Sequence, residues 1–431
     1  MSTPIALNST SRDSAEQSAC RKAAWRLIPL LAFAYFINYL DRTNVGFAAL
    51  TMNRDLGLSA SAFGLAAGIF YVGYCLFEVP SNLALYRYGA RRWLARIMIT
   101  WGLFAAATSF AVGPTSYAFI RLMAGIGEAG FFPGVIFYLT LWFPSQFRTR
   151  MMAIFLAAIP LSSVFSGPLS VSMLQLDGVL GLHGWQWLFV LQGLPACVLG
   201  VVCLFALPDG PAHAKWLTDD EQRALQDALE RERSTTHERD FRKSLKDSRV
   251  WLLAAILFSY IIGILGIGVW MPTILKTHHL TDMQVGLATA IPYIVGSLAM
   301  LAWARVLARK RRYVKHLVLT CAVAAIGFFA SVASSSLLPA MFGLTVAIVG
   351  LSSVRTCFYS IPATFLDKQA AAGGVAFINA VGSLGGLVGP AMVGWQKDVT
   401  GSFNAGLTGM GGMLVLATLL SAYLKTQVKE A

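Results

Sequence analysis

Apolar residues run along this chain in long blocks separated by short polar stretches. A helix needs about 20 apolar residues to cross ~30 Å of hydrocarbon. Twelve blocks reach that length, so we expect each to form a membrane-spanning helix. The expected spans are residues 25–51, 60–85, 93–112, 116–141, 149–173, 185–207, 249–275, 283–307, 314–334, 338–362, 371–396 and 403–424.

The longest polar stretch, residues 208–248, divides the spans six and six. Within it, TDDEQRALQDALERERS predicts a short surface helix with Thr218 as its N-cap. The expected units are a tail (1–24), a six-helix bundle (25–207), the linker (208–248), a second six-helix bundle (249–424) and a tail (425–431).

The two halves echo each other at an offset of about 222 residues. Ile69-Phe70-Tyr71 aligns with Ile291-Pro292-Tyr293, and Gly167-Pro168 aligns with Gly389-Pro390. Such duplication is typical of secondary transporters, whose substrate site lies between the repeats. We therefore predict an all-α integral membrane protein made of two pseudo-symmetric bundles.

Composition and charge placement agree with a membrane protein. Hydrophobic residues make up 56% of the chain and charged residues only 13%, about half the usual share of a soluble domain. The net charge of +13 could indicate a nucleic-acid partner. However, 28 of the 34 Lys and Arg fall in alternate loops and tails. That asymmetry predicts cytoplasmic termini and no nucleic-acid partner.

Six charged side chains lie in the interiors of the expected spans, more than four residues from either end. A charge at the centre of a span costs about 2.5 to 3.5 kcal/mol, so such residues are candidates for function. They are Asp41, Arg42, Glu78, Arg121, Glu128 and Arg355.

Arg121 and Glu128 are two helical turns apart and should point the same way. Ala124 and Gly125 lie between them on that face and leave room for a ligand. A guanidinium matches a carboxylate in shape, so Arg121 is our candidate anion anchor. The alternative is that these charges form permanent ion pairs between the first and fourth spans.

Asp41 and Arg42 are neighbours and diverge by about 100° on a helix, so they should serve different contacts. Asn38 and Tyr39 extend the polar strip of this span. A carboxylate in a dry site changes protonation readily when an arginine pairs with it or leaves it. Asp41 and Glu128 are therefore our candidate proton carriers.

Two further charges lie toward the expected cytoplasmic side. Glu78 precedes Pro80 near a helix end, which favours a gate or helix-end contact. For Arg355 two interpretations stay open. It could reach the membrane interface or contact a second substrate carboxylate.

Two further sequence features do not indicate a nucleotide, metal or catalytic site. The run GIGEAG fits a nucleotide-binding pattern but lies inside an apolar span with no preceding strand, where small residues let helices approach closely. The histidines show no metal or nucleophile spacing. We therefore expect no enzyme activity, no metal and no cofactor.

Several motifs carry a family likeness. They include YLDRTNVGFA, FYVGYCLFEVPSNL, RLMAGIGEAGFFPGVIFYLTLWFP and GGVAFINAVGSLGGLVGP. The sequence resembles the anion-to-cation symporters of the major facilitator superfamily, in the branch of tartrate, phthalate and 4-hydroxyphenylacetate permeases. The resemblance implies a monomer in a bacterial inner membrane.

The resemblance also implies a function and site residues. It implies proton-coupled import of a small organic carboxylate, with an organic anion exchanger or efflux carrier as the alternative. Proton coupling is implied at Asp41 and Glu128, and substrate carboxylate contact at Arg121 with Arg42 nearby. Polar substrate contacts are implied at Tyr39, Tyr74, Asn379 and Ser383.

Overall fold

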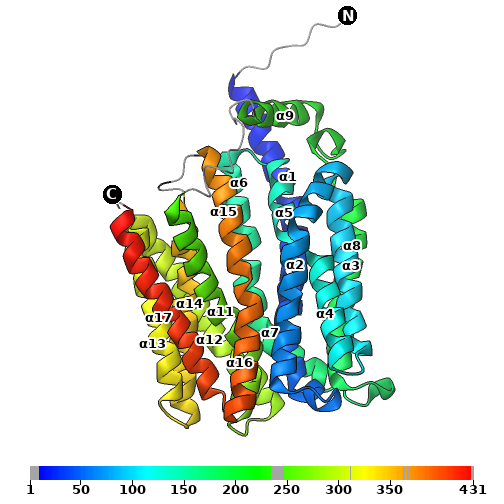
Figure 1. Ribbon diagram of the computed structural model, residues 1–431. Coiled ribbons are helices and arrows are strands. Elements are labelled where there is room, and N and C mark those ends of the chain that lie inside the picture. The colour runs from blue at the N-terminus through cyan, green and yellow to red at the C-terminus, as the bar shows by residue number, and fades with distance from the viewer. Residues whose placement is uncertain (1–8, 234–246, 311, 363–364, 366–367, 429–431) are drawn as a thin grey trace, which may run out of the picture.

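The computed structural model describes residues 9–233, 247–310, 312–362, 365 and 368–428 (Figure 1). Within this part of the chain all regular secondary structure is helical, and twelve segments are long and apolar enough to cross a membrane. Most spans are single helices: α1 (Ser9–Asp55), α2 (Ala60–Tyr88), α3 (Ala90–Ala107), α8 (Gly184–Ala206), α11 (Ser248–Lys276), α12 (Asp282–Lys310), α13 (Tyr313–Val332), α14 (Leu337–Phe358) and α17 (Asn404–Gln427).

The remaining three spans each consist of two helices. They are α4 (Pro114–Glu128) with α5 (Phe131–Thr140), α6 (Ser145–Leu156) with α7 (Ala158–Leu174), and α15 (Lys368–Ser383) with α16 (Gly385–Thr400). Pro133 and Pro160 lack the N–H that would continue the helix ladder to Ala129 and Leu156, where two of the breaks occur.

The glycine-rich run in the fourth span corrects the expectation of one continuous helix. Gly125 allows close approach as predicted, because a Cβ there would lie 2.0 Å from the carbonyl oxygen of Phe70 in α2. Gly130, however, has φ of 87° and interrupts the span. L-residues rarely adopt that conformation, so a glycine suits the break. The chain therefore turns just after Glu128, the last residue of α4.

The two ends of the helix bundle differ. The first residues of α1, the end of α17 and the linker helix α9 (Asp219–Arg233) lie at one end, here called the linker end (Figure 1). The opposite end is called the short-loop end. Residues 9–24, expected to be a polar tail, instead continue α1 as a helix. Packing against α9 explains the difference, because Ala19, Cys20 and Ala23 are buried in one cluster with Leu225.

The predicted N-cap of α9 is present. Thr218 Oγ1 accepts a hydrogen bond from the Glu221 backbone, and Glu221 Oε2 accepts one from the Thr218 backbone. This reciprocal pair is a capping box. Glu221 also accepts hydrogen bonds from Ser18 (2.8 Å) and Lys22 (2.9 Å) of α1. One buried carboxylate thus begins α9 and attaches it to α1.

We expect this attachment to depend on pH. Burial alone would raise the pKa of Glu221, but hydrogen bonds from Lys22, Thr218 and Ser18 outweigh it and hold the pKa at about 2 instead of 4.5. A lowered folded-state pKa stabilises the attachment above pH 4.5, and that stability is lost as pH falls toward 2. Glu221→Gln should cost about 1 kcal/mol at pH 7, because Lys22 is partly exposed.

The distance between spin labels at positions 21 and 223, in a background without native cysteines, measures the attachment. The distribution should broaden below pH 4.5 in the parent chain and be broad already at pH 7 in Glu221→Gln. Glu230→Gln removes an exposed carboxylate from the same helix and should stay narrow. A narrow distribution in Glu221→Gln at pH 7 would contradict the assignment.

The two halves meet through related close contacts. A Cβ on Gly64 of α2 would lie 2.3 Å from the carbonyl oxygen of Pro390 in α16, and one on Gly167 of α7 would lie 2.2 Å from that of Gly286 in α12. Adding 222 to Gly64 gives Gly286, and subtracting it from Pro390 gives Pro168, which follows Gly167. The repeat seen in the sequence is therefore a repeat in packing.

These contacts gather toward the short-loop end. In α1, a Cβ on Gly46 would lie 2.5 Å from the carbonyl oxygen of Val269 in α11. Beyond it, the Ala60 and Ser61 backbones donate hydrogen bonds to Asp398 of the other half at 3.1 and 2.7 Å. Backbones this close leave no room for a passage, so the bundles are shut against each other on that side.

Candidate functional site

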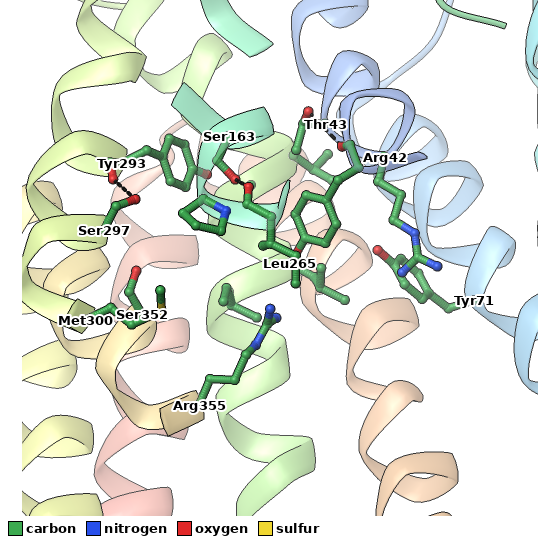
Figure 2. Close-up of a pocket in the computed structure, with 16 residues that line it drawn as sticks. Arg42, Thr43, Tyr71, Ser163, Leu265, Tyr293, Ser297, Met300, Ser352 and Arg355 are labelled. Atoms are coloured by element: carbon green, nitrogen blue, oxygen red, sulfur yellow. Dashed lines mark hydrogen bonds between the residues drawn. The ribbon is translucent and has the colours of Figure 1, made fainter. Parts of the chain in front are cut away.

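A cavity lies between the two halves. Its volume is about 90 Å³, several times the roughly 10 to 15 Å³ that one ordered water needs. Helices α1, α2 and α7 line it on one side, and α11, α12 and α14 on the other (Figure 2). It therefore has the position that the repeat predicts for a substrate site.

The cavity wall combines two arginines with aromatic and aliphatic hydroxyls. The polar lining residues are Tyr39, Arg42, Thr43, Tyr71, Ser163, Tyr293, Ser297, Ser352 and Arg355. Among the residues that the structure describes, none that lines the wall carries a carboxylate side chain. A site with two cations, many hydroxyls and no anion of its own suits an anionic, hydroxylated ligand.

Arg42 pairs with Glu128 beside the cavity. Its Nε donates to Glu128 Oε1 at 2.7 Å, and its Nη2 donates to the same oxygen. The Glu128 side chain is fully buried, whereas that of Arg42 is 20% exposed. The other carboxylate oxygen, Oε2, has no hydrogen-bond partner of normal geometry among the described residues. A proton at Oε2 would neutralise the anion without breaking another bond.

The Arg42 and Glu128 pair bears on whether ion pairs join the first span to the fourth, which the sequence left open. An ion pair does join the first span to the fourth, but through Arg42 rather than Arg121. The guanidinium of Arg42 also stacks over the ring of Tyr74, 5.0 Å from its centroid. The arginine is thereby held at the cavity by an anion on one helix and an aromatic ring on another.

Asp41 points away from Arg42, as the helical angle predicts. Its Oδ2 accepts a hydrogen bond from Trp101 of α3 at 3.0 Å, and its Oδ1 accepts one from Asn44 at 3.1 Å. Asp41 is only 1% exposed and does not line the cavity. Arg121 is the cation with the largest electrostatic effect on Asp41, ahead of Arg42.

Arg121 does not line the cavity either. It is buried, and its guanidinium lies over the ring of Phe70, 4.9 Å from the centroid. Its Nε and Nη1 have no hydrogen-bond partner in the described part of the chain. Arg42 also contacts the Phe70 ring, at 5.6 Å. The structure therefore brings Arg42 to the cavity and leaves Arg121 behind Phe70.

Arg355 points into the cavity rather than toward the membrane interface (Figure 2). It lies near the linker end of α14, which runs from the short-loop end to the linker end. Helical side chains tilt toward the start of their helix, so Arg355 leans toward the middle of the membrane. Its electrostatic neighbours include the hydroxyl groups of Tyr39, Tyr260 and Tyr359.

The other predicted contacts lie around the cavity and not on its wall, except Tyr39. Tyr74 supports Arg42, and Ser383 interacts with Cys75. Asn38 lies near Glu128, but its buried amide has no hydrogen bond of normal geometry.

Closer to the linker end, Asn379 accepts a hydrogen bond from Tyr359 at 3.0 Å. Glu78, partly buried in the same region, interacts electrostatically with Tyr359.

The sequence interpretation missed most of the hydroxyl wall. Tyr71 and Tyr293 both line the cavity, one from each bundle. They are the last residues of the two triplets that align in the internal repeat. The repeat therefore contained a signal for them, whereas nothing in the local pattern singles out Ser163, Ser297 or Ser352.

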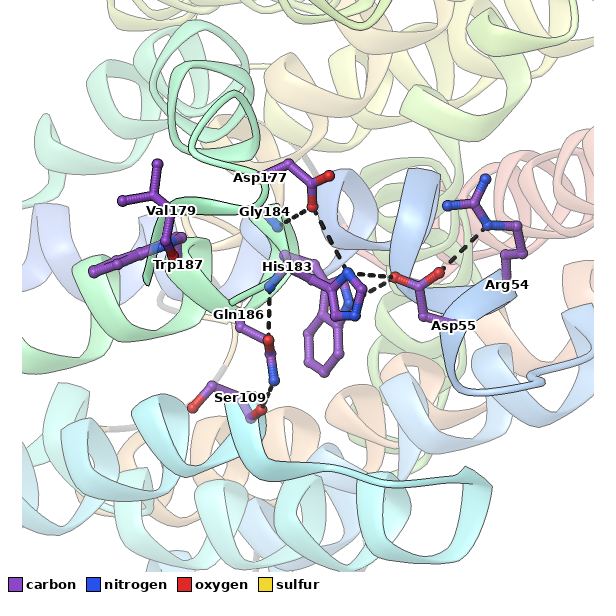
Figure 3. Close-up of polar contacts among 10 residues, drawn as sticks. Arg54, Asp55, Ser109, Asp177, Val179, His183, Gly184, Gln186 and Trp187 are labelled. Atoms are coloured by element: carbon purple, nitrogen blue, oxygen red, sulfur yellow. Dashed lines mark hydrogen bonds and ion pairs between the residues drawn. The ribbon is translucent and has the colours of Figure 1, made fainter. Parts of the chain in front are cut away.

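A second polar cluster lies at the short-loop end, away from the cavity (Figure 3). His183 Nδ1 is 3.6 Å from Asp55 and 3.8 Å from Asp177. Trp185 donates to Asp55 at 3.1 Å, and the Gly184 backbone donates to Asp177 at 2.8 Å. Among the described residues no group of three such side chains is arranged to hold a metal ion. These contacts join α1 to the loop before α8.

Comparisons with known proteins agree with this architecture. A family model described as Major Facilitator Superfamily matches residues 31–390. A protein of Agrobacterium vitis named "Putative tartrate transporter" is 44% identical over 418 residues, covering 96% of this chain and 93% of that protein. A "Quinolone resistance transporter" of Acinetobacter baumannii is 39% identical over 410 residues, covering 94% of each.

A solved structure has the same helix arrangement. It is that of a bacterial homologue of the human lysosomal transporter Spinster, in an inward-facing and occupied conformation. The TM-score is 0.76 over 94% of this chain and 97% of that chain, at 15% sequence identity. At that identity the likeness concerns the fold alone.

Proposed function

This chain belongs to the major facilitator superfamily, and from that premise we propose that it is a proton-coupled symporter that imports a small organic carboxylate. The proposed substrate is a hydroxy dicarboxylate such as tartrate, for which the Agrobacterium vitis relative is named, or an aromatic acid such as phthalate. The proposal includes a monomer in a bacterial inner membrane with the linker end in the cytoplasm.

The observation that carries the proposal is the Arg42 and Glu128 pair beside the cavity. A substrate carboxylate and Glu128 compete for the same guanidinium. When Glu128 accepts a proton at Oε2, it loses its charge and Arg42 becomes available to the substrate. When the substrate leaves, Arg42 returns to Glu128 and displaces the proton. Binding of anion and proton is thereby linked at one side chain.

Asp41 is the proposed second proton site. Arg121 acts on it electrostatically and has two N–H groups without a hydrogen-bond partner among the described residues, so protonation of Asp41 changes the charge balance next to Phe70. Importing one anion against a negative interior costs about 2.3 kcal/mol per 100 mV, and each accompanying proton returns the same amount. Two protons would carry a dianion without electrical opposition.

Alternating access completes the proposal. The close contacts between the bundles lie on the short-loop side of the cavity, at Gly46, Gly64 and Gly167. Release of substrate then occurs toward the linker end, and uptake requires these glycine contacts to separate.

Transport by purified protein in liposomes tests the function. Labelled tartrate and phthalate should accumulate inside when the outside is acidified. Their uptake should also lower the internal pH, which a pH-sensitive dye inside the liposomes reports. Accumulation should exceed equilibration and collapse when a protonophore is added. Uptake that is indifferent to the pH gradient would exclude proton symport.

The alternative is an exchanger or efflux carrier of organic anions, which the name of the Acinetobacter baumannii relative favours. Quinolones carry a carboxylate, so the same arginines could bind them. An exchanger would require an internal counter-substrate and leave the dye unchanged. An efflux carrier would lower labelled quinolone in energised cells, whereas the proposed importer would not.

A further inference from the structure

We infer that Arg355 is a second anion subsite, which takes one carboxylate of a dianionic substrate while Arg42 takes the other. The inference rests on the carboxylate transport proposed above. It narrows the substrate class from any small organic acid to one with two ionised carboxylates. It also assigns Arg355 as the residue that distinguishes the two kinds of acid.

The first argument is the charge of Arg355. The hydroxyl groups of Tyr39, Tyr260 and Tyr359 have the largest electrostatic effects on it, and no ion pair joins it to a carboxylate among the described residues. A permanent cation within a membrane-spanning helix is costly, and such residues normally pair or face a cavity. Arg355 faces the cavity, so an anionic ligand would supply the missing partner.

The second argument is direction. Arg42 lies on α1, which runs from the linker end to the short-loop end. Arg355 lies on α14, which runs in the opposite direction. Because helical side chains tilt toward the start of their helix, Arg42 leans toward the linker end and Arg355 leans away from it. The two guanidinium groups thus approach a common level from opposite bundles (Figure 2).

The third argument is the number of donors left free. Arg42 uses Nε and Nη2 for Glu128, while its other N–H groups remain for a ligand. Ser297 and Ser352 add hydroxyl groups from the bundle that carries Arg355, and Tyr71 adds one from the bundle that carries Arg42. A dicarboxylate with polar substituents can satisfy both sides and join the bundles through itself.

The fourth argument is charge balance. Arg42 and Glu128 cancel, so the cavity carries one net positive charge from Arg355. Protonation of Glu128 makes Arg42 available for one carboxylate, as proposed above, and Arg355 takes the other. A diacid therefore neutralises both cations of the protonated site, whereas a monoacid held by Arg42 leaves Arg355 without an anion.

Binding of matched acids tests the inference. The probes are tartrate and phthalate, each compared with its monomethyl ester, which keeps the shape but loses one charge. For the parent protein at pH 7, each diacid should bind at least about tenfold more tightly than its ester. In Arg355→Gln this preference should fall to about one, while ester binding stays within about threefold of the parent.

Two further variants complete the design. Arg355→Lys keeps the positive charge but lacks the paired donors of a guanidinium, so it should retain part of the preference for diacid over ester. Arg305→Gln removes an exposed arginine at the linker end of α12 and should retain all of it. Ester binding by Arg355→Gln doubles as the check that the variant is folded.

The outcomes separate the two claims. Equal binding of diacid and ester by the parent protein would overturn the second subsite and leave carboxylate transport standing. An equal loss of both ligands in Arg355→Gln would also overturn it, because Arg355 would then support the cavity as a whole. Failure of the parent protein to bind any of the four probes would count against the proposed function itself.

Discussion

Replacing Glu128 with glutamine should abolish proton-driven accumulation while substrate exchange across the membrane continues. Glutamine has nearly the same shape but is permanently neutral, so it mimics the protonated state. Arg42 then stays available to the substrate, and the variant can bind and move it in either direction. Glu128 is the proton site that shares its cation with the substrate, and Asp41 does not line the cavity, so without Glu128 the pH gradient no longer drives substrate binding and release.

The measurement is the ratio of internal to external substrate in liposomes with an acidic exterior. The ratio should fall from well above one to about one, whereas exchange of labelled for unlabelled substrate should stay within about tenfold of the parent rate. Glu230→Gln, on the exposed face of α9, should change neither quantity. Accumulation that survives in Glu128→Gln would exclude Glu128 as the proton carrier.

The membrane-spanning architecture could be predicted from the sequence because the bilayer enforces it. In hydrocarbon, every backbone group must be paired within a helix, so a long apolar block has one outcome. The expected span 249–275 and the observed α11 (Ser248–Lys276) differ by one residue at each end. Polar ends are less constrained. The start of α1 is helical because α9 packs against Ala19, Cys20 and Ala23, and that contact depends on residues some 200 positions away.

The arrangement of the charged residues was only partly predictable. Their spacing correctly predicted that the side chains of Asp41 and Arg42 point in different directions, because both lie on one uninterrupted helix. It did not reveal that Glu128 would meet Arg42 and that Arg121 would lie behind Phe70. Those outcomes depend on how α1, α2 and α4 rotate and pack, and on the break that Gly130 introduces just after Glu128.

The environment of Arg355 also could not be predicted from its position in the sequence. Its position near a helix end suited either the interface or the substrate, and the sequence could not choose. The direction of α14 decides, since it points the side chain inward. Tyr71 and Tyr293 could have been found, because a cavity between repeats is lined by equivalent residues of each.

Replacing Arg42 with alanine should weaken carboxylate binding by about 100-fold, the upper range for losing charged hydrogen bonds. Arg121→Ala should weaken it by about tenfold or less at a fixed state of protonation, because Arg121 does not line the cavity. This contrast distinguishes the anchor expected from spacing from the one that the cavity geometry favours. Equilibrium binding of labelled tartrate to the purified variants measures both.

Arg42→Ala also leaves the buried Glu128 without its partner, which could unfold the protein rather than empty the site. The double variant Arg42→Ala with Glu128→Gln removes both charges and should fold as the parent does while still binding poorly. Restored binding in the double variant would mean that Arg42 only compensates Glu128. Complete loss in Arg121→Ala, with binding retained in Arg42→Ala, would return the anchoring role to Arg121 and require the Phe70 ring to move aside during transport.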